Sequence, residues 1–123
     1  MNSVFVKRLF LASLVAFAFL FVPRLALAHA HLESSTPAAN ATVQGPNVAI
    51  ELRFNSRVDG QRSTLGIEIA GGSGKASLVH DSQRSENTLN AHATLRPGHY
   101  VIQWQALATD GHITRGEIPF TVQ

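Results

Sequence analysis

Residues 100–105 read Tyr-Val-Ile-Gln-Trp-Gln, and the alternation in this stretch decides the fold. Successive side chains of an extended strand point to opposite faces, so Tyr100, Ile102 and Trp104 share one face. That face is apolar and aromatic, whereas the opposite face carries two glutamines. The stretch therefore predicts a β-strand with one buried face, and its two aromatic side chains are expected in the core.

Six further segments read as short strands between turn residues. They are residues 32–35, 48–54, 65–69, 76–79, 88–95 and 118–122. Pro119 cannot donate a hydrogen bond to a neighbouring strand, so the last strand is expected to lie at a sheet edge or to pair on one side there. No helical period of 3.6 residues follows Ala28. The chain is therefore predicted to be all-β, an immunoglobulin-like, antiparallel Greek-key sandwich of about seven strands, with a small barrel as the alternative.

Residues 1–28 have the pattern of a cleavable signal peptide. Two basic residues precede a largely apolar run, residues 9–22, which is shorter than the roughly 20 residues needed to cross a bilayer. Ala26 and Ala28 are small residues at the positions that a signal peptidase reads. We expect cleavage after Ala28, export, and one folded domain comprising residues 29–123.

The predicted mature domain, residues 29–123, keeps seven of the ten basic residues against all eight acidic ones, which gives a net charge of −1 with neutral histidines. No basic patch remains that would favour nucleic acid as a partner. The chain has no cysteine, and its one methionine, Met1, is lost with the signal peptide. The mature domain therefore offers no sulfur ligand to a metal ion.

Histidine points most directly to a function, because all six histidines of the chain follow Ala28. Cleavage there would make His29 the first residue, whose free amine and imidazole can chelate one metal ion. Asp110 and His112 flank Gly111 in a predicted tight loop, so a carboxylate and an imidazole would lie side by side. If both segments meet at one end of the sandwich, His29, Asp110 and His112 form a metal site. Nitrogen-rich ligation with one oxygen favours Cu(II) first and zinc second.

His31 is a candidate additional ligand that competes with His29. A free amine, two deprotonated backbone amides and an imidazole at the third position can wrap Cu(II) together, and residues 29–31 have this pattern. If the residues after His31 lie in a sheet, some of those amides are held by neighbouring strands. We therefore expect His29 as the ligand and His31 as a nearby fourth or gating imidazole. The remaining histidines are expected on the surface: His80, His92 and His99.

Three parts of the chain form a recognisable combination. Residues 29–38 read HAHLESSTPA, residues 95–104 read LRPGHYVIQW, and residues 110–112 read DGH, followed by GEIPF at residues 116–120. In this order they resemble the CopC family of periplasmic copper-binding proteins. The resemblance implies a periplasmic protein of copper homeostasis or resistance that holds Cu(II) through His29, Asp110 and His112. It also implies a CopD-like copper transporter of the inner membrane as a partner.

The chain departs from part of this family in two respects. No methionine remains for the second, methionine-rich Cu(I) site of some members, and residues 54–57 read Phe-Asn-Ser-Arg where some members supply a glutamate to copper. One Cu(II) ion per chain, bound without catalysis, is therefore expected. The alternative is a copper-dependent oxidative enzyme similar to lytic polysaccharide monooxygenases, in which a terminal histidine also chelates copper. Those enzymes usually have a larger chain and an aromatic platform for sugar.

Overall fold

The computed structural model describes residues 29–123, which form nine β-strands and no helix. In chain order the strands are β1 (Leu32–Thr36), β2 (Thr42–Val43), β3 (Asn47–Phe54), β4 (Thr64–Ile69), β5 (Lys75–Ala76), β6 (Val79–Asp81), β7 (Thr88–Thr94), β8 (Gly98–Leu107) and β9 (Ile113–Val122). The expected signal peptide, residues 1–28, lies outside the described residues. Within the described part of the chain, no helix is long and apolar enough to span a membrane.

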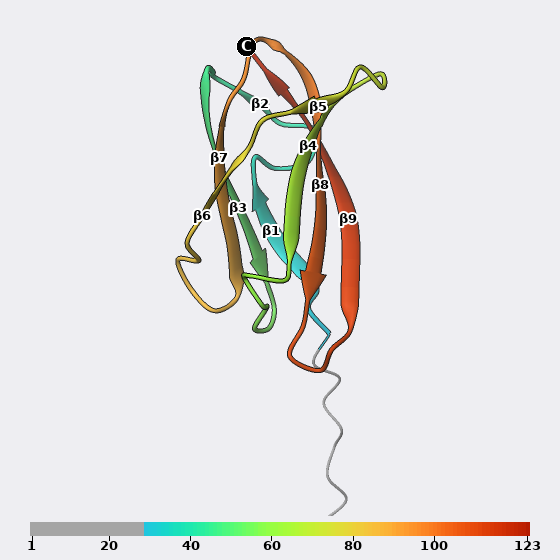
Figure 1. The fold of residues 1–123 in the computed structure, drawn as a ribbon. Helices are drawn as coiled ribbons and strands as arrows, with labels where there is room; N and C mark the ends of the chain where they lie inside the picture. Colours follow the sequence, from blue (N-terminus) through green and yellow to red (C-terminus); the bar gives the residue numbers. More distant parts are fainter. Residues whose placement is uncertain (1–28) are drawn as a thin grey trace, which may run out of the picture.

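The strands form two sheets that pack face to face (Figure 1). One sheet has the order β1-β3-β7-β6 and the other the order β2-β9-β8-β4-β5. Every pairing is antiparallel except the short contact between β2 and β9. Neighbours such as β3 and β7 are distant in sequence, because the connections between them run through the opposite sheet. The predicted immunoglobulin-like sandwich is confirmed.

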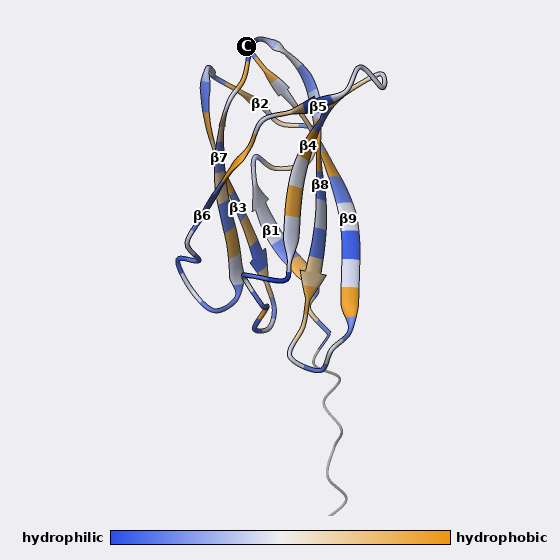
Figure 2. Ribbon diagram, in the orientation of Figure 1, coloured by the Kyte–Doolittle hydropathy of each residue, from blue (hydrophilic) through white to orange (hydrophobic). Residues whose placement is uncertain are grey.

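Alternating side chains from both sheets build the core. Along β8, Tyr100, Ile102 and Trp104 are buried, as the alternation predicts. Phe54 of β3 meets Trp104 edge to face with ring centroids 5.3 Å apart, and Phe120 of β9 stacks on Tyr100 at 5.7 Å. Figure 2 shows the same pattern as hydrophobic and hydrophilic bands that alternate along the strands. The two aromatic pairs thus fill the space that two facing sheets leave between them.

The prediction of one strand over residues 76–79 is wrong. Ala76 ends β5 in the five-stranded sheet and Val79 begins β6 in the four-stranded sheet, so the chain crosses between the sheets within this segment. Strands of two or three residues are too short to show a period, which is also why the described residues contain nine strands rather than about seven. β9 begins at Ile113, earlier than predicted. Its mostly polar first half also pairs with β8, from Ile113 opposite Leu107 to Glu117 opposite Gln103.

Pro119 pairs on one side only. Its ladder partner is Val101 of β8, while β2 pairs with β9 at Thr121 and Val122. On the β2 side, the Pro119 carbonyl accepts a hydrogen bond from the Asn40 backbone N–H at 2.6 Å. The missing N–H donor of Pro119 therefore leaves no gap in the ladder between β8 and β9. The prediction that the last strand pairs on one side at Pro119 is confirmed.

Gly116 of β9 makes room for the Trp104 indole. A Cβ atom at this position would lie 2.5 Å from Trp104 Cζ2, so the indole or the backbone would have to move. We expect Gly116→Ala to lower the free energy of unfolding by about 1–3 kcal/mol, the usual cost of overpacking a core. Urea unfolding followed by the fluorescence of the single tryptophan measures this change. Gly66→Ala in β4 is the matched control, since nothing lies within 4 Å of its Cβ position, and equal losses in both variants would contradict the close contact.

Candidate metal centre

The loop between β8 and β9 presents Asp110 and His112 side by side. The Ala108 backbone N–H donates to the His112 carbonyl at 2.9 Å, and the Gly111 N–H donates to the Ala108 carbonyl at 3.0 Å. Gly111 has a φ of +84°, in the left-handed region that suits a residue without Cβ. The loop therefore forms the predicted tight turn at one end of the sandwich (Figure 1). It carries a carboxylate and an imidazole two residues apart.

Two side-chain hydroxyls bind backbone carbonyls of the segment before β1 and hold it at the same end of the sandwich as this loop. Ala30 is completely buried, and its carbonyl accepts a hydrogen bond from Thr114 Oγ1 at 2.7 Å. The His29 carbonyl accepts a hydrogen bond from Ser56 Oγ at 3.4 Å. Because Thr114 is the second residue of β9, these contacts bring His29 to the end of the sandwich that carries Asp110.

His29, Asp110 and His112 form a group that could hold a metal ion, the one such group found within residues 29–123. One ligand atom from each lies within 4.8 Å of the others. Asp110 Oδ2 is 3.0 Å from His112 Nδ1 and 3.7 Å from His29 Nε2, and the two imidazole centroids are 4.3 Å apart. His29 Nε2 is buried without a hydrogen-bond partner, a state that costs free energy unless an ion or another group binds there. The donor set therefore fits a metal ion.

The pKa of Asp110 is lowered below its usual value. The largest cause is the hydrogen bond that the His112 backbone N–H donates to Asp110 Oδ1 at 3.0 Å. Desolvation is the second-largest effect and raises this pKa, while the side-chain contact with His112 and the charges of the two histidines when protonated add smaller lowering effects. The carboxylate is therefore ionised throughout the range in which imidazoles gain and lose protons, as an anionic metal ligand must be.

The structure brings together the three predicted ligands and leaves His31 outside their group. His31 is exposed, and its ring centroid lies 6.3 Å from that of His29. His92 is exposed and its Nδ1 contacts Asp81 at 2.9 Å, a pair without a third ligand in the described part of the chain. The other two predicted surface histidines are also exposed: His80 and His99.

Three residues that position the site were not predicted from the sequence. Ser56 and Thr114 bind the carbonyls of the first residues, as described above, and Asn55 pairs with His31. Each acts on the backbone of another segment, and an isolated serine, threonine or asparagine carries no periodic signal for such a contact. Only the tertiary structure reveals them.

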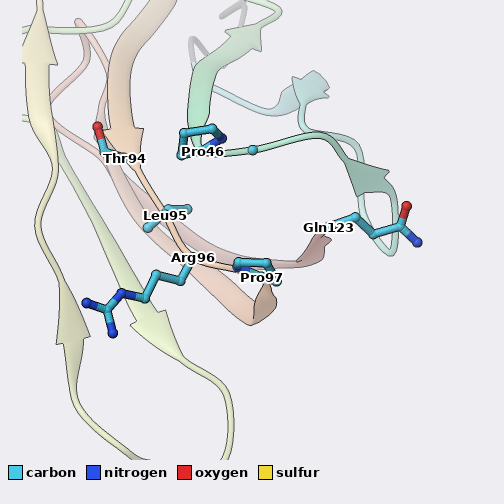
Figure 3. Close-up of a pocket in the computed structure, with 7 residues that line it drawn as sticks. Pro46, Thr94, Leu95, Arg96, Pro97 and Gln123 are labelled. Atoms are coloured by element: carbon cyan, nitrogen blue, oxygen red, sulfur yellow. The ribbon is translucent and has the colours of Figure 1, made fainter.

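The opposite end of the sandwich carries a hollow without metal ligands (Figure 3). It has a volume of about 370 Å³ and lies beside the C-terminus, far from the β8–β9 loop in Figure 1. Its lining is Gly45, Pro46, Thr94, Leu95, Arg96, Pro97 and Gln123, which includes no imidazole and no acidic side chain. This hollow therefore offers no alternative to the group of His29, Asp110 and His112.

Comparison with known proteins decides the family. The family model of the CopC domain matches residues 32–123. The chain belongs to the CopC family. The match begins three residues after His29, so membership rests on the sandwich and the β8–β9 loop rather than on His29.

Two relatives and one crystal structure are also similar to this chain. Protein YobA of Escherichia coli strain K12 is 34% identical over 101 residues, which cover 78% of this chain and 80% of YobA. The crystal structure of CopC from Methylosinus trichosporium OB3b superposes with a TM-score of 0.70 at 29% identity, covering 77% of this chain and 94% of that one. The copper transport protein CutJ of Bacillus subtilis strain 168 is 26% identical over 106 residues, which are 83% of this chain but only 19% of CutJ.

Proposed function

We propose that the processed chain binds one Cu(II) ion in the periplasm and acts in copper homeostasis or resistance. The observation that carries the proposal is the meeting of His29, Asp110 and His112, whose ligand atoms lie within 4.8 Å of one another. Membership of the CopC family supports copper as the cargo, and one relative is named a copper transport protein. The same site serves sequestration and delivery, because both need an ion held at an accessible loop.

The proposal requires removal of residues 1–28, because a peptide bond before His29 turns its amine into an amide. A free amine and the Nδ1 atom of the same histidine can close a chelate ring on one metal ion. In the structure Nε2 is the ring nitrogen that lies 3.7 Å from Asp110 Oδ2, so joint binding of a metal ion by Nδ1, the amine and Asp110 requires the imidazole to reorient. With His112, the processed site then offers an amine, two imidazoles and one carboxylate.

This donor set favours Cu(II). Three nitrogens and one oxygen suit the tetragonal geometry of Cu(II), and zinc would accept the same donors in a tetrahedron as the second choice. Cu(I) prefers sulfur, but the chain has no cysteine and its one methionine is Met1. We therefore propose a single site for Cu(II) and no methionine-rich Cu(I) site.

The acceptor of delivered copper is proposed to be a CopD-like transporter of the inner membrane. The β8–β9 loop and His112 are exposed, so a partner can approach the ion without opening the sandwich. Transfer of copper from the loaded protein to vesicles that contain such a transporter would support this role. Retention of all copper by the protein would favour sequestration instead.

We propose binding without catalysis. The anionic oxygen of Asp110 favours the higher charge of Cu(II) and opposes the reduction that a copper-dependent oxidative enzyme needs. Trp104, the single tryptophan, is 9% exposed and cannot form a platform for sugar. Copper-loaded protein incubated with ascorbate and chitin or cellulose should therefore yield no oxidised products. Their appearance would favour the enzyme resembling lytic polysaccharide monooxygenases.

The most direct test of the proposed function is the mass and metal content of the protein purified from the periplasm. A mass that corresponds to residues 29–123, together with one copper ion per chain, is the expected result. A chain that keeps residues before His29, or one that holds no Cu(II) when copper is supplied, would contradict the proposal.

The Cu(II) affinity is expected to fall as the pH is lowered from about 7 to about 5, because protons compete with the metal ion for the imidazole nitrogens. Asp110 adds no slope in this window. The pKa of Asp110 is lower in the folded state than in the unfolded chain, so its ionised carboxylate stabilises the folded state. This contribution is complete above the pKa of the unfolded chain and is lost as the pH falls through the lower pKa of the folded state. Competition titrations across the window measure the affinity. A flat profile would contradict imidazole ligation.

A further inference from the structure

The first residues of the processed chain contain two competing ways to bind a metal ion. In the first, the His29 amine and ring act together with Asp110 and His112. In the second, which we call the planar mode, the amine, the amide nitrogens of the next two residues and the His31 imidazole surround the metal. The two amide protons then go to solvent. Square-planar nitrogen ligation of this kind suits both Cu(II) and Ni(II).

His31 and Asn55 form a reciprocal pair of hydrogen bonds. The His31 N–H donates to Asn55 Oδ1 at 2.8 Å, and the Asn55 N–H donates to the His31 carbonyl at 3.0 Å. The next residues along, Leu32 and Phe54, are partners in the ladder between β1 and β3. The pair therefore extends this ladder by one position, and the His31 amide is held by the Asn55 side chain.

Ala30 opposes the planar mode as well. It is completely buried, and its carbonyl is bound by Thr114 Oγ1 at 2.7 Å. The planar mode needs successive amide nitrogens to converge on one point, whereas successive N–H groups of an extended chain point to opposite sides. Adopting it would withdraw Ala30 from the core and break the hydrogen bonds to Asn55 and Thr114.

We infer that Asn55 is a positioning residue that directs the metal to His29, Asp110 and His112 by holding the His31 amide in the ladder. The inference rests on the proposed function, since both modes need the free amine. Asn55 acts through the backbone of His31, because its Oδ1 accepts the His31 N–H. The consequence is selectivity among metal ions. The folded protein keeps Ni(II) from binding in the planar mode, which residues 29–31 would allow in a free peptide.

The test follows Ni(II) bound to protein purified from the periplasm and shown by mass to start at His29. Asn55→Ala removes the acceptor oxygen and leaves the strand pairing of β1 intact. We expect the fraction of Ni(II) in the planar, amide-bound form to rise about fivefold, the shift that one hydrogen bond of about 1 kcal/mol allows. A synthetic peptide of residues 29–34 supplies the reference visible spectrum, and circular dichroism checks the fold.

Matched variants separate positioning from general loosening. Asn55→Asp keeps an acceptor oxygen for the His31 N–H, so the planar, amide-bound fraction of Ni(II) should stay at the wild-type level whatever the added carboxylate does to the rest of the spectrum. The double variant Asn55→Ala/His31→Ala lacks the imidazole of the planar mode and should lose the fivefold gain. If Asn55→Ala fails to fold, Thr114→Val removes the hydrogen bond to the Ala30 carbonyl and should raise the same fraction.

The Cu(II) electron paramagnetic resonance spectrum distinguishes failure of this inference from failure of the proposed function. If Asp110→Ala alters the Cu(II) spectrum, the proposed copper site stands. A wild-type Ni(II) spectrum in folded Asn55→Ala would then overturn only the role of Asn55. If Asp110→Ala leaves the Cu(II) spectrum unchanged, the copper site itself is overturned and the inference falls with it.

Discussion

Extending the processed chain by one alanine before His29 is expected to weaken Cu(II) binding by more than about 100-fold. The added peptide bond replaces a basic amine by an amide and opens the chelate ring. Loss of a partner that only orients a ligand costs about 10–100-fold in metal affinity, so loss of a ligand should exceed the upper end of that range. Competition with a chelator whose colour reports free Cu(II) measures the affinity.

One alanine added after Gln123 is the matched control for this extension. Gln123 is exposed, and the C-terminus lies at the end of the sandwich opposite the β8–β9 loop (Figure 1). The control lengthens the chain equally and should leave the Cu(II) affinity unchanged. Equal weakening by both extensions, or by neither, would contradict a role for the His29 amine.

Asp110→Ala is likewise expected to lower the Cu(II) affinity by more than about 100-fold. Asp110 supplies the only carboxylate of the metal-binding group. It also orients His112 twice, through the backbone N–H at 3.0 Å and through Nδ1 at 3.0 Å. The variant therefore loses one ligand directly and the alignment of a second. Isothermal titration with Cu(II) in a competing buffer measures the loss.

Asp81→Ala is the matched control for Asp110→Ala. Asp81 contacts His92 Nδ1 at 2.9 Å, so it is also one half of a carboxylate–imidazole pair, but no third ligand joins it in the described residues. The Cu(II) affinity of this variant should equal that of the wild type. Thermal unfolding of the metal-free proteins should show both variants folded at the temperature of the titration, with the lower midpoint for Asp110→Ala because the stabilising contacts of this carboxylate are lost. An Asp110→Ala protein that is unfolded at that temperature would attribute its weaker binding to unfolding.

Each of the three candidate ligands has a local signal in the sequence. His29 follows the predicted cleavage site, and Asp110 and His112 flank a glycine, whose φ of +84° confirms the tight turn. Their meeting has no local signal, because it depends on Thr114 binding the carbonyl of Ala30, a residue far from it in the sequence. The three ligands could therefore be predicted from the sequence, but whether they lie close together depended on the fold.

The competition between His29 and His31 shows the same limit. Residues 29–31 alone are compatible with the planar mode. Strand pairing was expected to oppose this mode, but the group that pairs with the His31 amide could not be predicted. The structure identifies that partner as Asn55, through a contact between segments far apart in sequence. A hydrogen bond from a backbone amide to the side-chain oxygen of a residue far away in the sequence has no signal in the local sequence of either residue.

The sequence by itself determined the long strands, their buried faces and the chemistry of the donors. Alternation over residues 100–105 and 48–54 is a local property that one buried face imposes on a strand, and ligand type follows from residue type. Only the tertiary structure decided where the chain crosses between sheets near residues 76–79, and that His29 lies within reach of Asp110. Both depend on which segments pair across long separations, where packing and hydrogen bonds between distant residues outweigh any local preference.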